Sequence, residues 1–341
     1  MSLKISTISL AARVDHLRKP ESYPTLPVSV ETKETHMSWV FLAGALAYKL
    51  TKPTKAELLD SRTIELRRKD CQREVRLNRR LATGVYYGVV PLTIDSSGAF
   101  QLEGDGQPVD WLVKMRRLPD SLMLDWQIEH NCLHEVDFRR AIAAICRFYQ
   151  QSRPFEISVR QYGDRLSDDL VQSCQELVSP RYEQSDDLVR RVHACLLNYI
   201  EQQRSSLEAR VRAGRVIDAH GDLRPEHICL EPRPVIIDCL QFDQRLRILD
   251  TASELSFLSL ECERLGAGDS SEVIWPVYSE VCQDQPPSHL LDFYKAYHAC
   301  LRAMVSAWHL KDDVPDAEKW TLRAHDYLQI AESLASRLFE E

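Results

Sequence analysis

The sequence predicts an α+β fold with two lobes, a small strand-rich lobe followed by a larger helical one. Three patterns support this prediction. Strand-like apolar patterns dominate up to Leu118, long helical periods prevail from Glu135 onward, and a compact strand-rich insert at residues 216–249 interrupts the helical part. A chain of 341 residues is long enough for two domains or for one large two-lobed domain.

The first lobe is expected to follow an amphipathic helix at residues 8–17 and a proline-containing linker that ends at Pro27. Gly44 marks a tight turn between two strands, and residues 61–81 form a helix whose exposed side is charged. The expected strands cover residues 28–34, 38–43, 45–50, 86–94 and 110–118.

The second lobe is expected to be mostly helical after Pro119. Its insert holds two short apolar strands, at residues 228–230 and 235–237, joined by a proline-rich turn. The expected helices cover residues 136–151, 170–177, 186–212, 252–265, 288–310 and 317–338. The chain therefore divides into a helix and linker (1–27), a first lobe (28–118) and a second lobe (119–341).

Composition and charge exclude several classes of protein. The net charge of −8 argues against a broad nucleic-acid surface, which normally shows a basic excess. No stretch approaches the roughly 20 uninterrupted apolar residues that a membrane-spanning helix needs. The first residues lack the long apolar core of a signal peptide. A cytoplasmic location is expected, with neither nucleic acid nor a membrane as partner.

The ten cysteines are scattered singly, without any CxxC pair. This spacing predicts buried, reduced thiols in a cytoplasmic protein rather than disulfides or a zinc site. His130 and His134 have the i,i+4 spacing of a helical metal site, but the glutamate that a zinc protease carries after its first histidine is missing. We therefore interpret this segment as a helix surface.

The residues most informative about chemistry surround the two strands of the insert. Asp222 sits in a polar loop before the first strand, and Asp238 ends the second. Because a hairpin brings these two points close together, both carboxylates are expected to face one cleft. Phosphoryl transfer needs such a pair, since one carboxylate takes the proton of the acceptor hydroxyl and another holds Mg²⁺ at the phosphates.

His220-Gly221-Asp222 followed by Asp238 resembles the HGD…D signature of aminoglycoside phosphotransferases and related small-molecule kinases, which share the protein-kinase fold. The similarity extends to an uncharacterised bacterial subgroup, related to the phosphotransferase part of bifunctional aminoglycoside phosphotransferase/ATP-binding proteins. HGD alone is a weak motif, but it occurs here with a strand lysine, a helix glutamate and a second aspartate. The segments that carry the similarity are 34–38, 48–53, 77–81, 88–91, 114–118 and 238–239, with a weaker echo at 293–297.

The resemblance implies a role for each matching residue. Asp222 would be the catalytic base, Asp238 a magnesium ligand, and His220 a buttress of the loop. Lys49, on the third strand, would contact the α- and β-phosphates of ATP, and Glu74 on the next helix would orient it. The alternative interpretation is that Lys49 and Glu74 are surface charges.

Two further expectations concern nucleotide binding. Residues 114–118 would form the hinge, where backbone groups around Met115, Arg116 and Arg117 pair with the adenine edge. Glu65 competes with Glu74 as the partner of Lys49.

Two departures from the family pattern are visible. The fifth residue after the catalytic aspartate is usually an asparagine that provides a second magnesium contact, and here it is His227. An imidazole suits zinc or iron better than Mg²⁺, so His227 is either an active-site or metal contact or a packed loop residue. Residues 28–40 also contain no glycine, so Ser38 or the backbone near residues 35–37 would hold the phosphates.

Other charged residues have both a functional and a structural interpretation. Arg224 either steadies phosphate charge or pairs with Glu226, and Asp243 either reaches substrate or lies in a solvated turn. Asp250 is most simply the N-terminal cap of the following helix. An acidic helix face would attract a cationic acceptor, although a solvated face is commoner; its residues are Glu254, Glu261 and Glu263.

The leading hypothesis is an ATP- and Mg²⁺-dependent phosphotransferase that acts on a hydroxyl of a small molecule. The main alternative is a pseudokinase, a nucleotide-binding or regulatory protein in which His227 weakens catalysis. Transfer to a protein ranks last, because the residues after Asp238 contain neither a DFG motif nor a segment ending in APE.

Overall fold

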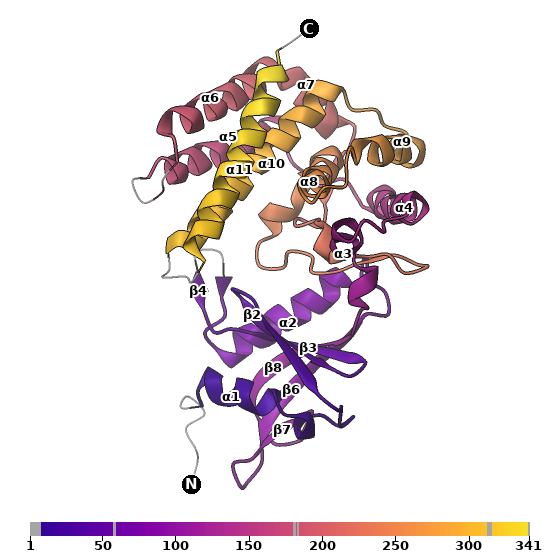
Figure 1. The fold of residues 1–341 in the computed structure, drawn as a ribbon, viewed down its shortest axis with the longest axis vertical. Helices are drawn as coiled ribbons and strands as arrows, with labels where there is room; N and C mark the ends of the chain where they lie inside the picture. The colour runs from indigo at the N-terminus through magenta and orange to yellow at the C-terminus, as the bar shows by residue number, and fades with distance from the viewer. Residues whose placement is uncertain (1–7, 57–58, 180–181, 183, 312–315, 340–341) are drawn as a thin grey trace. The chain divides into compact units, whose positions relative to one another are not determined.

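The computed structural model describes residues 8–56, 59–179, 182, 184–311 and 316–339. It divides into two compact units. Unit 1 comprises Met1–Gln127 and Glu226–Leu246 and contains the main sheet. Unit 2 comprises Ile128–Pro225 and Arg247–Glu341 and is mostly helical. Figure 1 shows the strands of the main sheet in indigo and purple and most helices in magenta to yellow. Residues 1–7 of the expected N-terminal segment lie outside the described residues.

Unit 1 is built on a six-stranded antiparallel sheet in the order β1-β2-β3-β8-β6-β7. Its strands are β1 (Val30–Glu34), β2 (Ser38–Ala43), β3 (Leu46–Thr51), β6 (Tyr86–Ile94), β7 (Phe100–Leu102) and β8 (Gln107–Arg116). The short pair β4 (Lys55–Ala56) and β5 (Leu59–Asp60) forms a separate hairpin. β3 is an inner strand, with Lys49 opposite Val40 of β2 and Val113 of β8.

Helix α2 (Ile64–Asn78) packs against β8 and β6 (Figure 1). It begins at the N-cap Thr63, whose side chain accepts a hydrogen bond from the Leu66 N–H and so satisfies one of the free amides of the first turn. Its buried face is polar at several positions, which are Arg67, Asp70, Glu74 and Asn78; Glu74 lies beside the buried Cys71 and Val75. This helix therefore presents a carboxylate, not an apolar side chain, at that point of its buried face.

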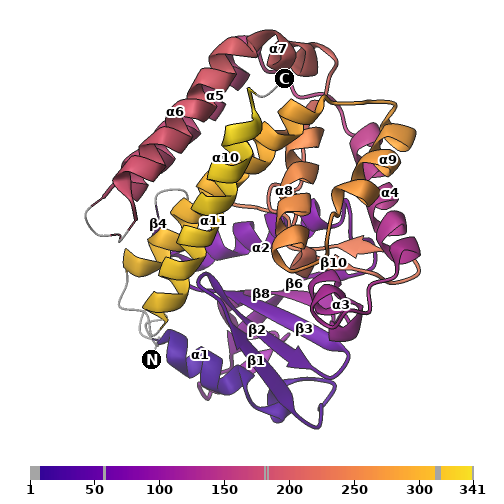
Figure 2. The ribbon, with the colours of Figure 1, turned by 45° about the horizontal axis from the view of Figure 1, so that its top comes forward.

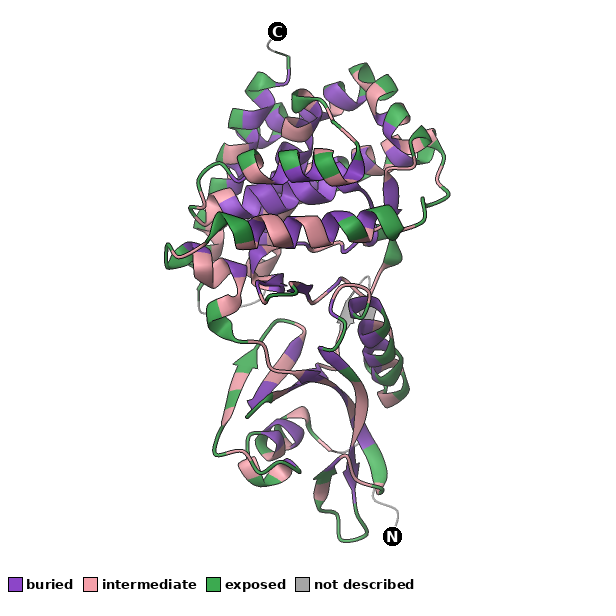
Figure 3. Cartoon of the chain, turned by 90° about the vertical axis from the view of Figure 1, so that its right-hand side faces the viewer, coloured by how far each residue is buried: buried purple, intermediate pink, exposed green. Residues whose placement is uncertain are grey.

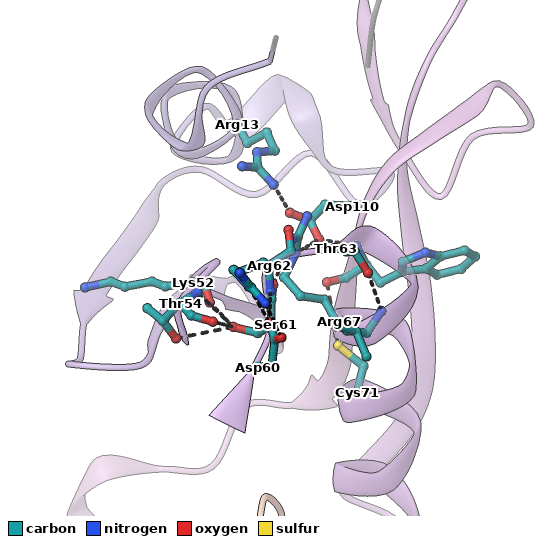
Figure 4. A network of polar contacts seen from close by, with 12 residues as sticks. Arg13, Lys52, Thr54, Asp60, Ser61, Arg62, Thr63, Arg67, Cys71 and Asp110 are labelled. Atoms are coloured by element: carbon teal, nitrogen blue, oxygen red, sulfur yellow. Dashed lines mark hydrogen bonds and ion pairs between the residues drawn. The ribbon is translucent and has the colours of Figure 1, made fainter. Parts of the chain in front are cut away.

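Helix α1 (Leu10–Leu17) belongs to the same unit. Val14 and Leu17 join the apolar core that contains Phe41 and Leu50. The helix is also held by charge, since Arg13 forms an ion pair with the fully buried Asp110 (Figure 4). A short 3₁₀ turn, η2 (Pro20–Ser22), follows it.

The hairpin of the insert is present as predicted. β10 (Ile228–Cys229) and β11 (Val235–Ile236) are antiparallel, with Ile228 opposite Ile236. It is tied to η3 (Asp120–Leu122), because the Leu230 N–H donates to the Leu122 carbonyl at 2.7 Å. Other short 3₁₀ segments are η4 (Pro225–His227), η5 (Gln244–Arg247) and η6 (His309–Lys311).

In the interior of unit 2, α8 is buried from Thr251 to Cys262 and packs against α10 and α9. Figure 3 shows this interior in purple, with exposed green residues on the outer helices. A two-stranded ladder of β9 (Val216–Asp218) and β12 (Ile248–Asp250) leads into α8. Its helices are α4 (Glu135–Gln151), α5 (Val159–Leu177), α6 (Asp186–Gln202), α7 (Arg204–Arg212), α8 (Thr251–Arg264), α9 (Ser271–Cys282), α10 (Ser288–Trp308) and α11 (Ala317–Arg337), with α3 (Leu124–Glu129) at the unit boundary.

Several expected elements differ from the observed ones. The helix expected at 186–212 breaks at Gln203 into α6 and α7. Helix α5 begins at Val159 because Ser158 and Gln161 form a capping box. Helix α9 was not expected, since Pro276 lies inside it and proline interrupts helical patterns.

The interpretation of His130 and His134 as a helix surface is wrong. Helix α3 ends at Glu129, and Asn131 adopts a left-handed conformation with φ of 52°. The helix cannot continue through such a residue, so the two histidines flank a turn before α4. His134 is the N-cap residue of α4.

The prediction of mostly buried cysteines without disulfides agrees with the structure. All ten cysteines are free, and seven of them are buried. Within the described part of the chain, no helix is long and apolar enough to cross a membrane.

Candidate functional site

Lys49 of unit 1 lies between two carboxylates. Its Nζ is 2.6 Å from Oδ1 of Asp238 and 3.0 Å from Oε1 of Glu74. Lys49 projects from β3 and Glu74 from the inner face of α2, so these two side chains meet between the strand and the helix. Glu65, the rival partner, is exposed. The pairing of Lys49 with Glu74 is therefore present in the structure.

The electrostatics of this cluster follow from its unequal burial. Burial alone would lower the pKa of Lys49, but Asp238 and Glu74 together raise it well above its usual value. Burial raises the pKa of Glu74, and the attraction of Lys49 opposes that effect. The side chain of Glu74 is 1% exposed, whereas that of Asp238 is 45% exposed. Asp238 is therefore the carboxylate of the cluster that solvent and ligands can reach.

The backbone of Asp238 is held in an unusual conformation. Its φ is +59°, a left-handed value that costs free energy for a residue with a side chain. Two buried side chains hold this segment: the Tyr86 hydroxyl accepts the Asp238 N–H at 3.2 Å, and Asn78 Oδ1 accepts the Cys239 N–H at 2.8 Å. Asn78 also donates to the Glu74 carbonyl at 3.0 Å. This residue of α2 therefore links the backbone of Glu74 to the segment that follows Asp238.

His227 is a further neighbour of the Asp238 carboxylate, in addition to Lys49. Its Nε2 is 3.7 Å from Asp238 Oδ2, and its backbone carbonyl accepts the Ile237 N–H at 2.9 Å. The side chain is buried. His227 is therefore packed against the hairpin beside Asp238, and its role as an active-site or metal contact stays a prediction.

The His-Gly-Asp loop of unit 2 is organised by one buried carboxylate. Oε1 of Glu254 accepts the N–H groups of His220 at 2.8 Å and of Gly221 at 2.6 Å, while its Oε2 accepts the Tyr149 hydroxyl at 2.8 Å. His220 is fully buried, and its Nδ1 accepts the Asp222 N–H at 3.3 Å. The histidine thus supports the backbone of the loop, as the resemblance implied.

The carboxylate of Asp222 is paired within the same loop. Arg224 approaches it with two nitrogens, Nε at 2.9 Å from Oδ1 and Nη2 at 2.9 Å from Oδ2. Gly221 has a φ of +87°, which a residue without a side chain adopts at little cost. The loop therefore combines a glycine-dependent turn, a buried histidine and a carboxylate whose orientation an arginine controls.

The chain was compared with known proteins. No protein-family profile matches it. Two proteins described as uncharacterized, from Mycobacterium tuberculosis and Mycobacterium bovis, are 30% identical to it over 298 residues. The alignment covers 84% of this chain and 57% of each relative, so the chain spans little more than half the length of these relatives.

Solved kinase structures resemble the chain over most of its length. Glucosamine kinase in complex with glucosamine, ADP and inorganic phosphate has a TM-score of 0.53 at 13% identity, covering 91% of this chain and 81% of that one. Choline kinase from Cryptosporidium parvum Iowa II has a TM-score of 0.52 at 12% identity, covering 95% of both chains. Choline kinase LicA from Streptococcus pneumoniae has a TM-score of 0.51 at 13% identity, covering 93% and 99%.

The chain has the protein-kinase-like fold. At these identities the similarity establishes the fold alone, and it agrees with the predicted architecture of a small strand-rich part and a larger helical part. The fold is also the one shared by the aminoglycoside phosphotransferases that the HGD motif resembles.

The expected hinge residues lie at the end of β8, the last long strand of the sheet. The Arg116 N–H donates to the Val85 carbonyl and the Arg117 N–H to the Ala45 carbonyl, each at 2.9 Å. Met115 is buried in the core. The backbone N–H groups of Arg116 and Arg117 are thus used inside unit 1, and adenine pairing through them stays a prediction that requires these bonds to change.

The arginine side chains of the hinge also have protein partners. Arg116 forms a two-point ion pair with Glu231, at 2.6 and 2.8 Å, and Arg117 contacts Glu31 at 3.0 Å. These contacts tie the end of β8 to the hairpin and to β1.

The remaining acidic residues take mostly structural positions. Asp250 accepts the Ala252 N–H at 2.9 Å, which confirms it as the N-cap of α8. Asp243 pairs with Arg245 in its own turn, with Oδ2 2.7 Å from the guanidinium. Glu254 is not part of a solvated acidic face, because it is buried beneath the His-Gly-Asp loop.

Sequence reasoning missed the residues that support the cluster and the loop. They are Asn78, Tyr86, Tyr149 and Glu254. A signal was available for Asn78, because it lies four residues after the predicted Glu74 on the inner stripe of the same helix. Glu254 was interpreted as part of an acidic helix face, and its role beneath the loop was missed.

Proposed function

We propose that this protein is an ATP- and Mg²⁺-dependent phosphotransferase that transfers the γ-phosphate of ATP to a hydroxyl group of a small molecule. The observation that carries the proposal is the position of Lys49, held at 3.0 Å by the buried Glu74 and at 2.6 Å by the more exposed Asp238. A fixed ammonium beside an accessible carboxylate is the arrangement that binds nucleotide phosphates together with a divalent cation.

The role proposed for Glu74 follows from its burial. A buried carboxylate needs a cationic partner, and Lys49 is the partner that the structure shows. The ion pair restricts the lysine to a few rotamers, so the ammonium is already oriented when a nucleotide arrives. In the proposed reaction the ammonium of Lys49, oriented by Glu74, contacts the α- and β-phosphates.

Asp238 fits a magnesium ligand and His227 does not. Mg²⁺ prefers oxygen ligands, and Asp238 presents a carboxylate that is 45% exposed, whereas His227 offers only an imidazole nitrogen. Asp238 would hold the metal, which supplies charge neutralisation at the phosphates when bound. His227 would instead orient the Asp238 carboxylate from its position 3.7 Å away.

Asp222 is proposed as the general base of the transfer. It accepts the proton of the acceptor hydroxyl while that oxygen forms a bond to the γ-phosphorus and the bond to ADP breaks. Arg224 fixes the direction of the carboxylate through its two contacts at 2.9 Å. The kinases of similar fold that act on choline and glucosamine support a small hydroxylated acceptor.

The first test is calorimetric titration of the full chain with ATP, with and without Mg²⁺. Lys49→Ala and Asp238→Ala should each abolish magnesium-dependent binding. Lys69→Ala is a matched control, because Lys69 is exposed on α2 and lies outside the proposed nucleotide residues. Wild-type protein that binds no nucleotide with or without Mg²⁺ would contradict the proposal.

A pseudokinase is the second candidate, and the position of His227 beside Asp238 favours it. His227→Asn separates the two functions. An active enzyme in which His227 orients Asp238 should lose turnover in the variant, whereas a degenerate kinase should gain it. ATP hydrolysis and transfer to hydroxylated metabolites measure the difference.

A further inference from the structure

Three arginines of unit 2 gather around one tyrosine. Tyr327 of α11 is fully buried, and its ring centroid lies 5.6 Å from the guanidinium carbon of Arg264, 5.9 Å from that of Arg302 and 5.9 Å from that of Arg323. The three come from α8, α10 and α11, which lie side by side in Figure 2. We call this group the arginine cluster.

The charge of the arginine cluster is poorly balanced among the described residues. Glu261 contacts two of its members, with Arg264 at 3.3 Å and Arg302 at 3.7 Å, and it also accepts the Tyr327 hydroxyl at 2.6 Å. The nearby Glu263 is already paired with Lys295 at 2.7 Å. One buried carboxylate therefore serves two guanidinium groups and a phenol.

Arg323 lacks a carboxylate partner in the described part of the chain. Its guanidinium lies near two aromatic rings, that of Trp320 at 5.8 Å and that of Tyr327. Stacking on aromatic faces holds the planar guanidinium in place without using its N–H donors. Arg323 is thus fixed in position with hydrogen-bonding capacity to spare.

Two nitrogens of the arginine cluster are buried and lack a hydrogen bond. They are Nε of Arg302, which faces Glu261 Oε1 only at 3.7 Å, and Nε of Arg323; neither has a hydrogen-bond partner among the described residues. Buried donors are nearly always satisfied, and an exception points to a missing ion or ligand. The side chain of Arg302 is 16% exposed and that of Arg264 is 25% exposed, so a small ligand can reach the group.

The arginine cluster is on the same helix face that supports the His-Gly-Asp loop. Glu254 holds that loop through the N–H groups of His220 and Gly221, and Glu261 follows it by two helical turns. Residues seven apart share a face of an α-helix and are about 10 Å apart along its axis. The arginine cluster and the His-Gly-Asp loop are therefore both anchored by carboxylates of α8.

We propose that Arg264, Arg302 and Arg323 bind an oxyanion group, a phosphate or a carboxylate, carried by the hydroxyl acceptor. The assignment of the ligand as the acceptor rests on the proposed function, whereas the anion site stands on the arginine cluster alone. A guanidinium presents its donors in a planar fork that matches both oxyanions. The acceptor is then an anionic metabolite, not the cationic one that an acidic helix face would attract.

Calorimetric titration of the full chain with inorganic phosphate, and separately with acetate, tests the anion site. We expect one phosphate site in the wild type, weakened about tenfold in Arg302→Gln and in Arg323→Gln, since each removes a charged donor. Arg337→Gln is the control, because Arg337 is on the same helix but pairs with Asp292 at 3.8 Å. Acetate binding as tight as phosphate binding identifies a carboxylate site, and weaker acetate binding a phosphate site.

Additional titrations separate the anion site from the proposed nucleotide site. Phosphate binding that survives Lys49→Ala is independent of the nucleotide residues, and it supports the anion site even if ATP does not bind. Phosphate binding that is absent in the wild type, lost only with Lys49, or weakened equally by Arg337→Gln overturns the proposal. Arg323→Lys keeps the charge without the fork, so intermediate binding by a folded variant excludes misfolding as the cause.

Discussion

At the scale of single residues, the candidate site depends on buried carboxylates that organise backbone rather than touch a ligand. Glu254 accepts two consecutive N–H groups, those of His220 and Gly221, and a phenolic hydroxyl. Such charge-assisted hydrogen bonds are stronger than neutral ones, especially away from water. Glu254 therefore determines where the Asp222 loop begins.

Glu254→Gln should destabilise the protein by about 2–3 kcal/mol, because an amide oxygen is a weaker acceptor and the new NH₂ group faces other donors. Turnover should fall while the affinity for ATP stays unchanged, since Glu254 is not among the proposed nucleotide residues. Urea denaturation and ATP titration measure the two effects. Tyr149→Phe, which removes one hydrogen bond to the same carboxylate at 2.8 Å, should cost about 1 kcal/mol. Equal effects of both substitutions would contradict this role.

Because the backbone of Asp238 is left-handed, its substitutions should differ in their effect on stability. Asparagine tolerates a φ of +59° and alanine does not, so Asp238→Ala should be less stable than Asp238→Asn by about 1 kcal/mol. Both should lose magnesium-dependent ATP binding. Thermal denaturation of the two variants checks the difference, and identical stabilities would show that the conformation relaxes.

At the scale of elements, α1 and α2 are connected through one buried aspartate. Asp110 of β8 is fully buried, forms an ion pair with Arg13 of α1, and lies 2.7 Å from Nε of Arg67 of α2. Arg67 also donates to the Ser61 carbonyl at 2.9 Å (Figure 4). The N-terminal helix is therefore part of the lobe that carries Glu74, although it looked like an appendage in the sequence.

Arg13→Met should reduce the free energy of unfolding by about 3 kcal/mol, because it leaves Asp110 buried with one cation. The double variant Arg13→Met/Asp110→Asn should recover part of that loss, since the unbalanced charge is gone. Urea denaturation measures both. Arg160→Met is the control, because Arg160 makes an exposed contact of 3.5 Å with Asp164. A double variant less stable than the sum of its single changes would argue against charge imbalance.

At the scale of the whole molecule, stability should depend on a buried histidine. His298 of α10 stacks on Phe257 and contacts Ser253 Oγ at 2.9 Å. Burial lowers its pKa to about 3. In the unfolded chain a histidine titrates near 6.5. Between these values the unfolded state binds a proton that the folded state does not, so stability falls as the pH decreases.

Lowering the pH from 7 to 5 should therefore cost the wild type about 2 kcal/mol more than His298→Gln, which does not titrate. Other acidic groups contribute equally to both proteins and cancel in the difference. Urea denaturation at the two pH values gives the result. Parallel losses in both proteins would show that His298 is protonated in the folded state.

The cysteines provide a second test at this scale. All ten are free, so the denatured protein should react with a thiol reagent at ten positions without prior reduction. A reductant should leave the melting temperature unchanged. Fewer reactive thiols would indicate a disulfide.

Local patterns were enough to predict the architecture and the position of much of the chemistry. Apolar periodicity identified most strands and helices, because a strand and a helix bury every second or every third to fourth residue wherever they lie. The hairpin that ends near Asp238, the capping role of Asp250 and the place of Lys49 on β3 followed from neighbouring residues in the same way. The helix ends near Gln203 and Asn131 were not predicted, because they depend on backbone conformation that composition does not encode.

Only the tertiary structure decided which residues meet. The choice of Glu74 over Glu65 as the partner of Lys49 depends on the rotation of α2 against the sheet. The burial of Glu254 under the His-Gly-Asp loop and the convergence of Arg302 and Arg323 on Tyr327 join segments far apart in the chain. Sequence spacing determines the face of an element on which a residue lies, whereas packing between elements determines what that face contacts.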